Sequence, residues 1–453
     1  MTADDTKTLW KEWDHAYLWH PFTQMREWLA EEPLFIEHAE GNYLFDQHGK
    51  RYFDGVSSLW CNVHGHGRQE IVEAITEQAR KVAHSTLLGL ANVPSTVLAK
   101  RLIDIAPQGL RRVFYSDSGA TAVEIALKMA FEYWQLRGDT RRDRYVSLAE
   151  SYHGDTIGAM SLGYSAGFHQ RYRPLLFPCL KISPPHVYRY YKGESREAAL
   201  AHALEEAEKV LGENRERVAA LIAEPLMQGA AGMWSHPTEY VVGLHDLCRK
   251  NNIVFMADEV AVGFGRTGKM FACEQAGITP DLMCLGKGIS GGTLPLAATL
   301  ATEEIFEAFL GEYEERRTFF HGHTYTGNPV ACAAALASLD LFAKERTLAR
   351  ISGLILQLSE LLEPVRRLGH VSDVRRRGLM VGIELAEDAA ALRAYPPGQR
   401  IGKKVMLEAR KRGVILRPIG DVIVLMPPLS TTPQELEMLV GVAAESIRAV
   451  TEK

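Results

Sequence analysis

The chain contains short, almost wholly apolar runs that alternate with longer segments in which apolar residues recur every three or four positions. Runs of the first kind are typical of strands buried on both faces, and segments of the second kind are typical of helices with one buried face. Expected strands lie within residues 111–119, 142–154, 216–229, 252–260, 280–288 and 294–302, and expected helices within residues 69–83, 120–138, 237–252 and 328–345. This alternation predicts an α/β fold with a mostly parallel central sheet covered by helices.

The two ends of the chain follow a different pattern. Residues 10–60 look irregular, and residues 370–453 carry more charge and alternate strand-like runs with helical segments. We therefore expect a smaller α+β domain built from both chain ends. The predicted division is a segment of residues 1–64 that joins the small domain, a large domain of residues 65–335, and a C-terminal small domain of residues 336–453.

Composition excludes several classes of protein. Of the 453 residues, 46% are hydrophobic and 24% charged, which is ordinary for a globular protein with a large core. The formal net charge of −5 argues against a nucleic-acid-binding protein, which would normally present a basic face. The six cysteines are scattered without a Cys-x-x-Cys pair, and neither a signal-peptide pattern nor a membrane-span run is evident. We expect a cytoplasmic protein without nucleic-acid or membrane partners.

Polar residues follow each of the predicted strands. In open α/β sheets, ligands bind beyond the carboxyl ends of the strands, so these residues are expected to converge on one site. The segments that follow five successive strands are Ser116–Gly119, Tyr152–Asp155, Glu224–Pro225, Asp258–Glu259 and Gly286–Gly288.

Ser118, Gly119 and Ala120 begin the longest predicted helix. The N–H groups at the start of a helix lack partners and lie at its positive end, so this segment is a candidate phosphate site. The alternative is an ordinary serine cap followed by a permissive glycine.

Lys287 and Asp258 are charged residues at the ends of apolar runs. Partial desolvation would make the Lys287 amine a nucleophile able to form an imine, whereas the alternative is a surface lysine in a loop. The run that ends in Asp258 has no other charge, so its carboxylate needs a cationic partner such as a pyridinium nitrogen. The alternative for Asp258 is a strand-end carboxylate that caps a loop.

Several other motifs carry weaker information. Residues 263–268 match the pattern Gly-x-Gly-x-x-Gly, but the segment comes late in the chain and lacks a clear helix start, so we favour a structural loop over a dinucleotide site. The sequence His-Gly-His occurs at residues 64–66 and 321–323 without a further ligand at matching spacing, so we expect no metal site. No hydrolase nucleophile elbow and no Walker loop is present.

Taken together, four motifs resemble class III pyridoxal-phosphate aminotransferases of fold type I. They are "SDSGATAVEIALKMA", "YHGDTIGAMS", "DEVAVGFGRTG" and Lys287 after an apolar strand, and the resemblance covers nearly the whole chain. Within the class, several segments are similar to the 7,8-diaminononanoate (diaminopelargonate) aminotransferases of biotin synthesis: "LWHPFTQM" (18–25), "SSLWCNVHGHG" (57–67), "FFHGHTYTGNPVACAAALASL" (319–339) and "RPIGDVIVLMPPL" (417–429).

This resemblance implies an enzyme that uses pyridoxal 5'-phosphate to transfer an amino group to 8-amino-7-oxononanoate. The implied amino donor is S-adenosylmethionine or, in one branch of the family, lysine. The partners would be these small molecules and a second copy of the chain, in a homodimer with the active site at the subunit interface.

The resemblance also implies roles for the residues that hold the cofactor. Lys287 would bond to it covalently and then move the substrate proton, and Asp258 would keep the pyridine nitrogen protonated. Tyr152 would stack on one face of the ring and Val260 would pack on the other. The phosphate would be bound by Ser118, Gly119 and Ala120 and, from the neighbouring subunit, by Thr324.

Other residues are implied to contact or support the substrate. Arg417 would bind the substrate carboxylate through two parallel hydrogen bonds. Phe22 and Trp60 would form walls of the substrate channel. Supporting positions behind the site are expected for Glu224, Asp155 and Gln228.

The sequence departs from the pattern of many S-adenosylmethionine-using members around the donor pocket. Those members often have a Trp-Trp pair at Leu59-Trp60, tyrosine at Phe22 and Val424, and proline at His323. In these positions the chain is closer to the lysine-using branch, so both donors stay open. The alternatives are a broad ω-amine:pyruvate transaminase and, more distantly, a glutamate-1-semialdehyde aminomutase, a dinucleotide-dependent oxidoreductase or a non-enzymatic binding module.

Overall fold

The computed structural model describes residues 3–452 and contains a seven-stranded central sheet. All neighbouring strands of this sheet are parallel except at β12, which is antiparallel to both of its neighbours. The fold is therefore α/β with a mostly parallel sheet, as predicted. In spatial order the strands are β4 (Leu110–Ser116), β12 (Ala297–Thr302), β11 (Leu282–Leu285), β10 (Val254–Asp258), β7 (Val218–Ala223), β5 (Arg144–Leu148) and β6 (Leu180–Ile182).

The apolar runs form buried strands because successive side chains enter two different cores. In β10, Val254 and Met256 pack in one core with residues of helix α6 (Gly119–Leu136). Phe255 and Ala257 point to the opposite face and pack with residues of helix α10 (Thr238–Lys250). A strand that alternates between two cores needs apolar residues at every position, as its sequence has.

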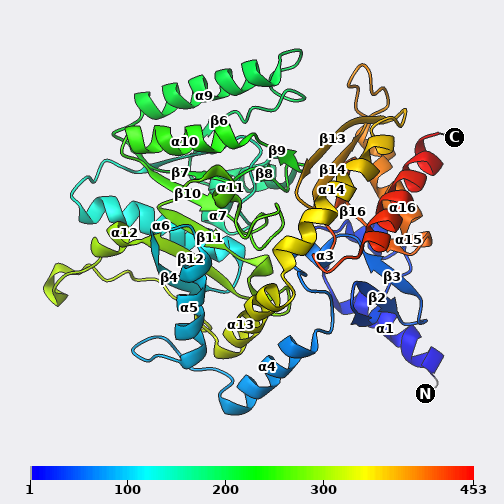
Figure 1. The fold of residues 1–453 in the computed structure, drawn as a ribbon, viewed down its shortest axis with the longest axis horizontal. Coiled ribbons are helices and arrows are strands. Elements are labelled where there is room, and N and C mark those ends of the chain that lie inside the picture. Colours follow the sequence, from blue (N-terminus) through cyan, green and yellow to red (C-terminus); the bar gives the residue numbers. More distant parts are fainter. Residues whose placement is uncertain (1–2, 453) are drawn as a thin grey trace.

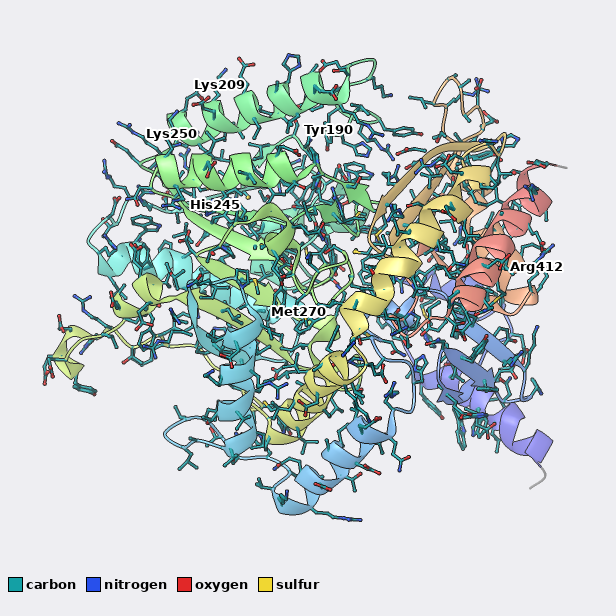
Figure 2. All side chains as sticks on the ribbon, in the orientation of Figure 1. Tyr190, Lys209, His245, Lys250, Met270 and Arg412 are labelled. Atoms are coloured by element: carbon teal, nitrogen blue, oxygen red, sulfur yellow. The ribbon has the colours of Figure 1, made fainter. Side chains whose placement is uncertain are left out.

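Helices cover both faces of this sheet (Figure 1). The outer helices α9 and α10 pack against each other, and their lysines Lys209 and Lys250 point away from the sheet (Figure 2). Besides α6 and α10, the helices of the large part are α4 (Gln69–Lys81), α5 (Val93–Ile105), α7 (Ile157–Leu162), α8 (Ala166–His169), α9 (Arg196–Glu213), α11 (Ala272–Ala276), α12 (Glu303–Glu307) and α13 (Pro329–Lys344), with the 3-10 helices η1 (Gln170–Leu175), η2 (Lys287–Ser290) and η3 (Tyr313–Glu315).

A smaller part contains two four-stranded sheets, at the right of Figure 1. One is antiparallel, in the order β13 (Val371–Arg377), β14 (Met380–Leu385), β17 (Val422–Leu425) and β16 (Arg417–Ile419). The other has the order β1 (Ile36–Glu40), β2 (Tyr43–Asp46), β3 (Arg51–Asp54) and β15 (Val414–Ile415). The helices here are α1 (Ala3–Tyr17), α2 (Met25–Trp28), α3 (Ser57–Trp60), α14 (Thr347–Val365), α15 (Ile401–Lys411) and α16 (Pro433–Thr451), with the 3-10 helix η4 (Pro397–Gln399).

Both ends of the chain meet in the second of these sheets. Strand β15 pairs with β3 through Val414 and Phe53, which stand near opposite ends of the sequence. We propose the predicted division into residues 1–64, 65–335 and 336–453 as the domain organisation. Its last boundary falls inside helix α13. The two-stranded hairpin β8 (Met227–Gln228) and β9 (Trp234–Ser235) lies between the large part and β13 (Figure 1).

One short strand did not follow from the sequence pattern. Strand β6 has three residues and forms the edge of the sheet beside β5. Its sequence is flanked by Pro178 on one side and by Pro184 and Pro185 on the other, so the apolar run is too short to show a period. Among residues 3–452, no helix combines the length and apolar character needed to cross a membrane.

Candidate active site

A cavity of about 460 Å³ lies beyond the carboxyl ends of the central strands. It brings together residues that are far apart in the sequence but that each follow a strand or begin a helix. Eight of the predicted cofactor and substrate residues line it, together with Asp155 and Glu224. The eight are Trp60, Ser118, Gly119, Ala120, Tyr152, Asp258, Val260 and Lys287.

Four predicted residues do not line this cavity. Phe22 is 61% exposed and contacts Phe168 edge to face. Thr324 is exposed and follows His323, which bonds to Asp117 at the start of α6.

Arg417 is exposed at the start of β16, and its charge acts on the Tyr152 phenol. Gln228 is buried and donates to the Ala149 carbonyl at 2.9 Å.

Lys287 lies between two glycines at the end of the apolar strand β11 and faces the cavity. Its backbone is left-handed, with φ of 42°, and its amine nitrogen lies 5.4 Å from the centre of the Trp60 ring. Burial lowers the pKa of Lys287, while the negative charge of Asp258 acts in the opposite direction. The geometry therefore favours an amine that can act as a nucleophile.

Asp258 ends strand β10 and is 4% exposed. One carboxylate oxygen lies 2.7 Å from Nδ1 of the buried His153, and the other accepts the Val260 N–H at 3.0 Å. His153 lies in the Tyr152–Asp155 segment, which was expected at the site, but no role for His153 itself was predicted. Its position directly after Tyr152 in "YHGD" was the available signal.

Glu224 is a second buried carboxyl group in the cavity. It accepts the Tyr152 N–H at 3.3 Å and the Gly229 N–H at 3.0 Å. Burial and the nearby charge of Asp258 raise the pKa of Glu224 to about 8, although the two N–H groups and Lys287 act in the opposite direction. The carboxyl group is therefore largely protonated at neutral pH.

Close packing of glycines shapes one wall of the cavity at the start of helix α6. A Cβ atom on Gly119 would lie 2.5 Å from Cγ1 of Val260, and one on Gly154 would lie 2.3 Å from Cβ of Ala120. Ser118 caps the helix by accepting the Thr121 N–H. The first N–H groups of this 18-residue helix begin beside the cavity and suit an anion.

These groups fit the shape and charge of pyridoxal phosphate. Lys287 would supply an amine for its aldehyde, Asp258 would supply a carboxylate for its ring nitrogen, and the start of α6 would supply donors for its phosphate. Tyr152 supplies an aromatic ring, and its hydroxyl donates to Asp155 at 2.8 Å. Burial raises the pKa of the Tyr152 hydroxyl, so this group stays neutral.

The weaker motifs occupy other positions. Loop 263–268 leads into the five-residue helix α11, and its Arg266 is buried and donates to the carbonyls of Pro427 and Asn62. The four histidines of the two His-Gly-His segments have separate partners: Ser338 for His64, Asp54 for His66, Lys128 for His321 and Asp117 for His323. Within residues 3–452, no three His, Cys, Asp or Glu side chains cluster in a way that could hold a metal ion.

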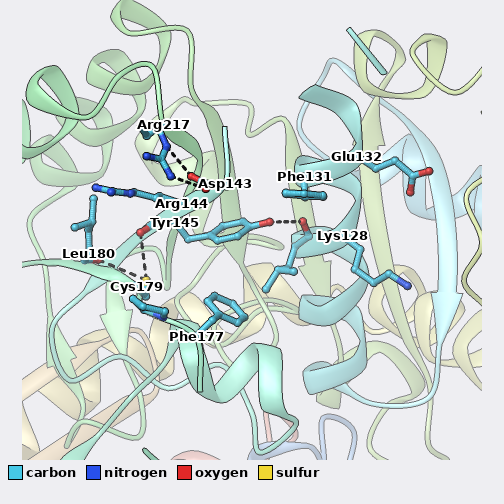
Figure 3. A pocket seen from close by; sticks show the side chains of 12 residues that line it. Lys128, Phe131, Glu132, Asp143, Arg144, Tyr145, Phe177, Cys179, Leu180 and Arg217 are labelled. Atoms are coloured by element: carbon cyan, nitrogen blue, oxygen red, sulfur yellow. Dashed lines mark hydrogen bonds and ion pairs between the residues drawn. The ribbon is translucent and has the colours of Figure 1, made fainter. Parts of the chain in front are cut away.

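Figure 3 shows a larger hollow, of about 660 Å³. It lies at the amino ends of β5 and β6, so it is at the opposite end of the strands from the candidate site, and this end is called the opposite edge below. The hollow surrounds the first residues of β5 and one side of α6 and contains none of the predicted site residues. Tyr145 reaches across it and donates to the Leu127 carbonyl at 2.9 Å, while Arg217 pairs with Asp143 at its rim.

Comparisons with known proteins agree with this geometry. Residues 25–446 match the model of the family described as aminotransferase class-III. An adenosylmethionine-8-amino-7-oxononanoate aminotransferase from Nitratidesulfovibrio vulgaris is 56% identical, covering 97% of this chain and 81% of that protein. The crystal structure of an enzyme with the same name from Methanocaldococcus jannaschii has a TM-score of 0.93 at 47% identity, covering 98% of this chain and 99% of that one.

A third relative has a different named activity. It is an amine transaminase from an uncultivated Pseudomonas species, solved in a PLP-bound form, with a TM-score of 0.92 at 36% identity over 96% of this chain and 99% of that one. The fold is thus shared by transaminases of different substrate range. The family match covers nearly the whole sequence, and on this basis the chain belongs to the class III aminotransferases.

Proposed function

We propose that this class III aminotransferase uses pyridoxal 5'-phosphate to convert 8-amino-7-oxononanoate into 7,8-diaminononanoate in biotin biosynthesis. The observation that carries the proposal is that Lys287 and Asp258 line the same cavity. The chain is also 56% identical to an enzyme whose name contains this amino acceptor. Pyridoxal phosphate, when bound, supplies an electron sink for the electrons that leave a substrate C–H bond.

Each of these cavity residues has its own role toward the cofactor in this proposal. Lys287 would hold the cofactor and would move the substrate proton, which its lowered pKa supports. Asp258, held by His153, would keep the ring nitrogen protonated. Tyr152 and Val260 would contact the ring from its two sides. Asp155 and Glu224 support Tyr152 through its hydroxyl and its N–H.

The phosphate site involves two copies of the chain in this proposal. Ser118, Gly119 and Ala120 would bind the phosphate in one subunit, and Thr324 would reach it from the partner. Thr324 lies in a hollow of about 1150 Å³ whose surroundings expose large apolar side chains, as an interface between copies would. These exposed side chains are Leu88, Leu90, Val93, Phe320 and Tyr325.

The substrate is oriented by residues above the cavity. Arg417 binds its carboxylate, because a guanidinium group suits two parallel hydrogen bonds. Trp60 and Phe22 form walls of the channel, with Trp60 buried beside the Lys287 amine and Phe22 on the surface. Gln228 supports the site from behind through its bond to Ala149.

S-adenosylmethionine is the favoured amino donor, since relatives at 47–56% identity carry its name. Lysine is the second candidate because of the residues at the donor pocket. Val424 is buried opposite Arg417 in the β16–β17 pair, where many S-adenosylmethionine-using members have tyrosine. Leu59, Phe22 and His323 depart from that pattern in the same direction.

A donor and acceptor screen tests the proposal. The purified protein, loaded with pyridoxal phosphate, is given 8-amino-7-oxononanoate with S-adenosylmethionine, lysine or a simple amine, and 7,8-diaminononanoate is measured. We expect product with S-adenosylmethionine, or with lysine if the donor pocket is of the second type. Turnover of simple amines with pyruvate and none with 8-amino-7-oxononanoate would instead identify a broad ω-amine transaminase, the activity class of the similar Pseudomonas structure.

The proposed location is the cytoplasm. All six cysteines are free thiols, as is usual for proteins of a reducing compartment. Fractionation of the native organism would test this, and recovery of the protein outside the cytoplasm would contradict it.

A further inference from the structure

The turn between β8 and β9, residues 229–232, joins the active site to the small part of the molecule. On the active-site side, the Gly229 N–H donates to Glu224 and Ala230 lines the cavity. Within the turn, the N–H groups of Gly232 and Met233 both donate to the Gly229 carbonyl, at 3.1 and 2.9 Å. A displacement at Gly232 is therefore passed directly to Gly229.

Arg375 holds the other end of this turn from strand β13. Its Nε and Nη2 atoms both donate to the Gly232 carbonyl, at 3.1 and 2.7 Å. The same guanidinium group bonds to Asp373 at 3.0 Å and to Glu384 at 2.6 Å, and its side chain is 4% exposed. With partners on three sides, this planar group has one orientation, and it fixes the direction of the Gly232 carbonyl.

The neighbouring strand β14 is shaped to receive the turn. A Cβ atom on Gly382 would lie 2.8 Å from the Gly232 oxygen and 2.8 Å from Cβ of Met233. Met233 itself has a left-handed backbone, with φ of 57°, and is fully buried. Such a conformation persists only where the surroundings hold it, and here Arg375 and Gly382 do so.

Glu224 passes the position of the turn to the cavity. Among residues 3–452, its hydrogen bonds come from two N–H groups, those of Gly229 and Tyr152. The turn also touches Trp60, because a Cβ atom on Gly229 would lie 3.2 Å from Cζ3 of that ring. Arg375, Gly232, Gly229, Glu224 and Tyr152 thus form one continuous chain of contacts.

We propose that Arg375 is a positioning residue of the active site: from the small part of the molecule it fixes the 229–232 turn, and through Glu224 it sets the backbone of Tyr152. The inference rests on the proposed aminotransferase function, in which Tyr152 stacks on the cofactor ring. A buried Arg–Glu pair is weak evidence for stability alone, so the orientation that it imposes is the more informative consequence.

The test compares Arg375→Met, Arg375→Lys and the matched control Arg376→Met. Arg376 is the next residue of β13, is also partly buried, and bonds to the Gly378 carbonyl and the Ser359 hydroxyl instead of the turn. The readouts are kcat and KM, the visible circular dichroism of bound pyridoxal phosphate, and hydrogen–deuterium exchange of residues 226–235 in cofactor-free protein.

For Arg375→Met we expect a kcat lowered roughly 10- to 100-fold with KM for the donor changed less than about threefold, because the reacting groups are misplaced by a fraction of an ångström. The circular dichroism band weakens and residues 226–235 exchange faster. Arg375→Lys recovers most of these losses, since it keeps the charge and one donor. Arg376→Met stays within about twofold of wild type in kcat.

Unchanged circular dichroism and exchange in Arg375→Met would overturn the inference, as would equal effects in Arg376→Met. If Arg375→Met does not fold, Glu384→Gln is the variant to test, because it weakens the hold on Arg375 but keeps a hydrogen-bond acceptor. A weaker circular dichroism band in Glu384→Gln would support the inference. A band equal to that of wild type would contradict it. A wild-type protein that binds pyridoxal phosphate but transfers no amino group would refute the proposed function, while dichroism and exchange still test Arg375.

Discussion

The two edges of the central sheet both carry hollows, and the smaller one holds the candidate active site. At the carboxyl edge, Lys287 faces the cavity with its pKa lowered by burial, and Glu224 is bound by N–H groups with its pKa raised to about 8. At the opposite edge, Arg217 pairs with Asp143, and Tyr145 donates to a backbone carbonyl. In the larger hollow these polar groups are already bonded to protein partners, so they are less able to act on a ligand.

This difference follows from the direction of the strands. Parallel strands place the residues that follow them at one edge, where loops and helix starts bring polar groups together. The opposite edge receives the residues that precede the strands, and here they satisfy one another. Volume alone would have favoured the larger of these two hollows, while buried ionisable groups with shifted pKa values point to the smaller one.

The largest contrast between the edges is expected for two lysines. Lys287→Ala should lower amino transfer by at least roughly 10³-fold, or about 4 kcal/mol of barrier, because the amine proposed to hold the cofactor is lost. Lys128→Ala, at the opposite hollow, should leave the rate within about twofold. Steady-state assays of both variants decide this, and full turnover by Lys287→Ala would refute the role of that residue.

The next contrast concerns two adjacent buried carboxylates. Asp258→Asn should lower kcat roughly 100-fold, because the ring nitrogen would lose the ionic partner proposed for it. Glu259→Gln should change kcat less than about threefold, since Glu259 accepts the N–H groups of Ala272 and Cys273 at the start of α11 and faces away from the cavity. Equal losses in kcat would undo the role assigned to Asp258.

A third contrast uses pH and unfolding. The pKa of Glu224 is raised to about 8 from an ordinary 4.5, so between these values the folded protein binds more protons than the unfolded chain and its stability falls as pH rises. Glu224→Gln removes this loss, and its stability relative to wild type should rise on the order of 3 kcal/mol from pH 5 to pH 8.

Urea unfolding of the cofactor-free protein at the two pH values measures this change. The acceptor lost in the glutamine lowers stability equally at both, so it cancels from the difference. Glu132→Gln at the opposite hollow is the matched control and should show a much smaller change, since Glu132 is only partly buried and the positive charge of Lys128 opposes the effect of burial on its pKa. A Glu224→Gln difference that is independent of pH would contradict the assignment.

The smallest contrast removes one hydroxyl from each edge. Tyr145→Phe loses the bond to the Leu127 carbonyl and should lower the unfolding free energy by about 1 kcal/mol without changing the rate. Tyr152→Phe loses the bond to Asp155 and should change kcat/KM several-fold. Thermal unfolding and steady-state kinetics separate the two effects; a changed rate in Tyr145→Phe would show that the opposite hollow contributes to the reaction.

Much of the site could be predicted from the sequence because its signals are local. Lys287, Asp258 and Ser118 each stand at the end of a strand or the start of a helix, and such ends meet at one edge of a parallel sheet. The partner of Asp258 could not be predicted, since His153 follows β5, which is separated from β10 by β7 in the sheet. The raised pKa of Glu224 could not be predicted either, because burial and the nearby charge of Asp258 arise only in the folded chain.

The fold was predictable where periodicity was strong and not where direction mattered. An apolar run such as β12 indicates a buried strand but not its orientation. The segment from Gly286 to Leu296 is too short for a helical crossover, so β12 returns antiparallel to β11. Phe22 and Thr324 stay predictions, because one chain leaves both on its surface.

The pairing of β3 with β15 sets the order in which a newly made chain can be completed. The residues of β3 pair with a strand that is made only after every strand of the central sheet. Gly55 bonds to Ile415 and Met426, so this segment, with Trp60 that lines the cavity, becomes fixed only after the central sheet has been synthesised.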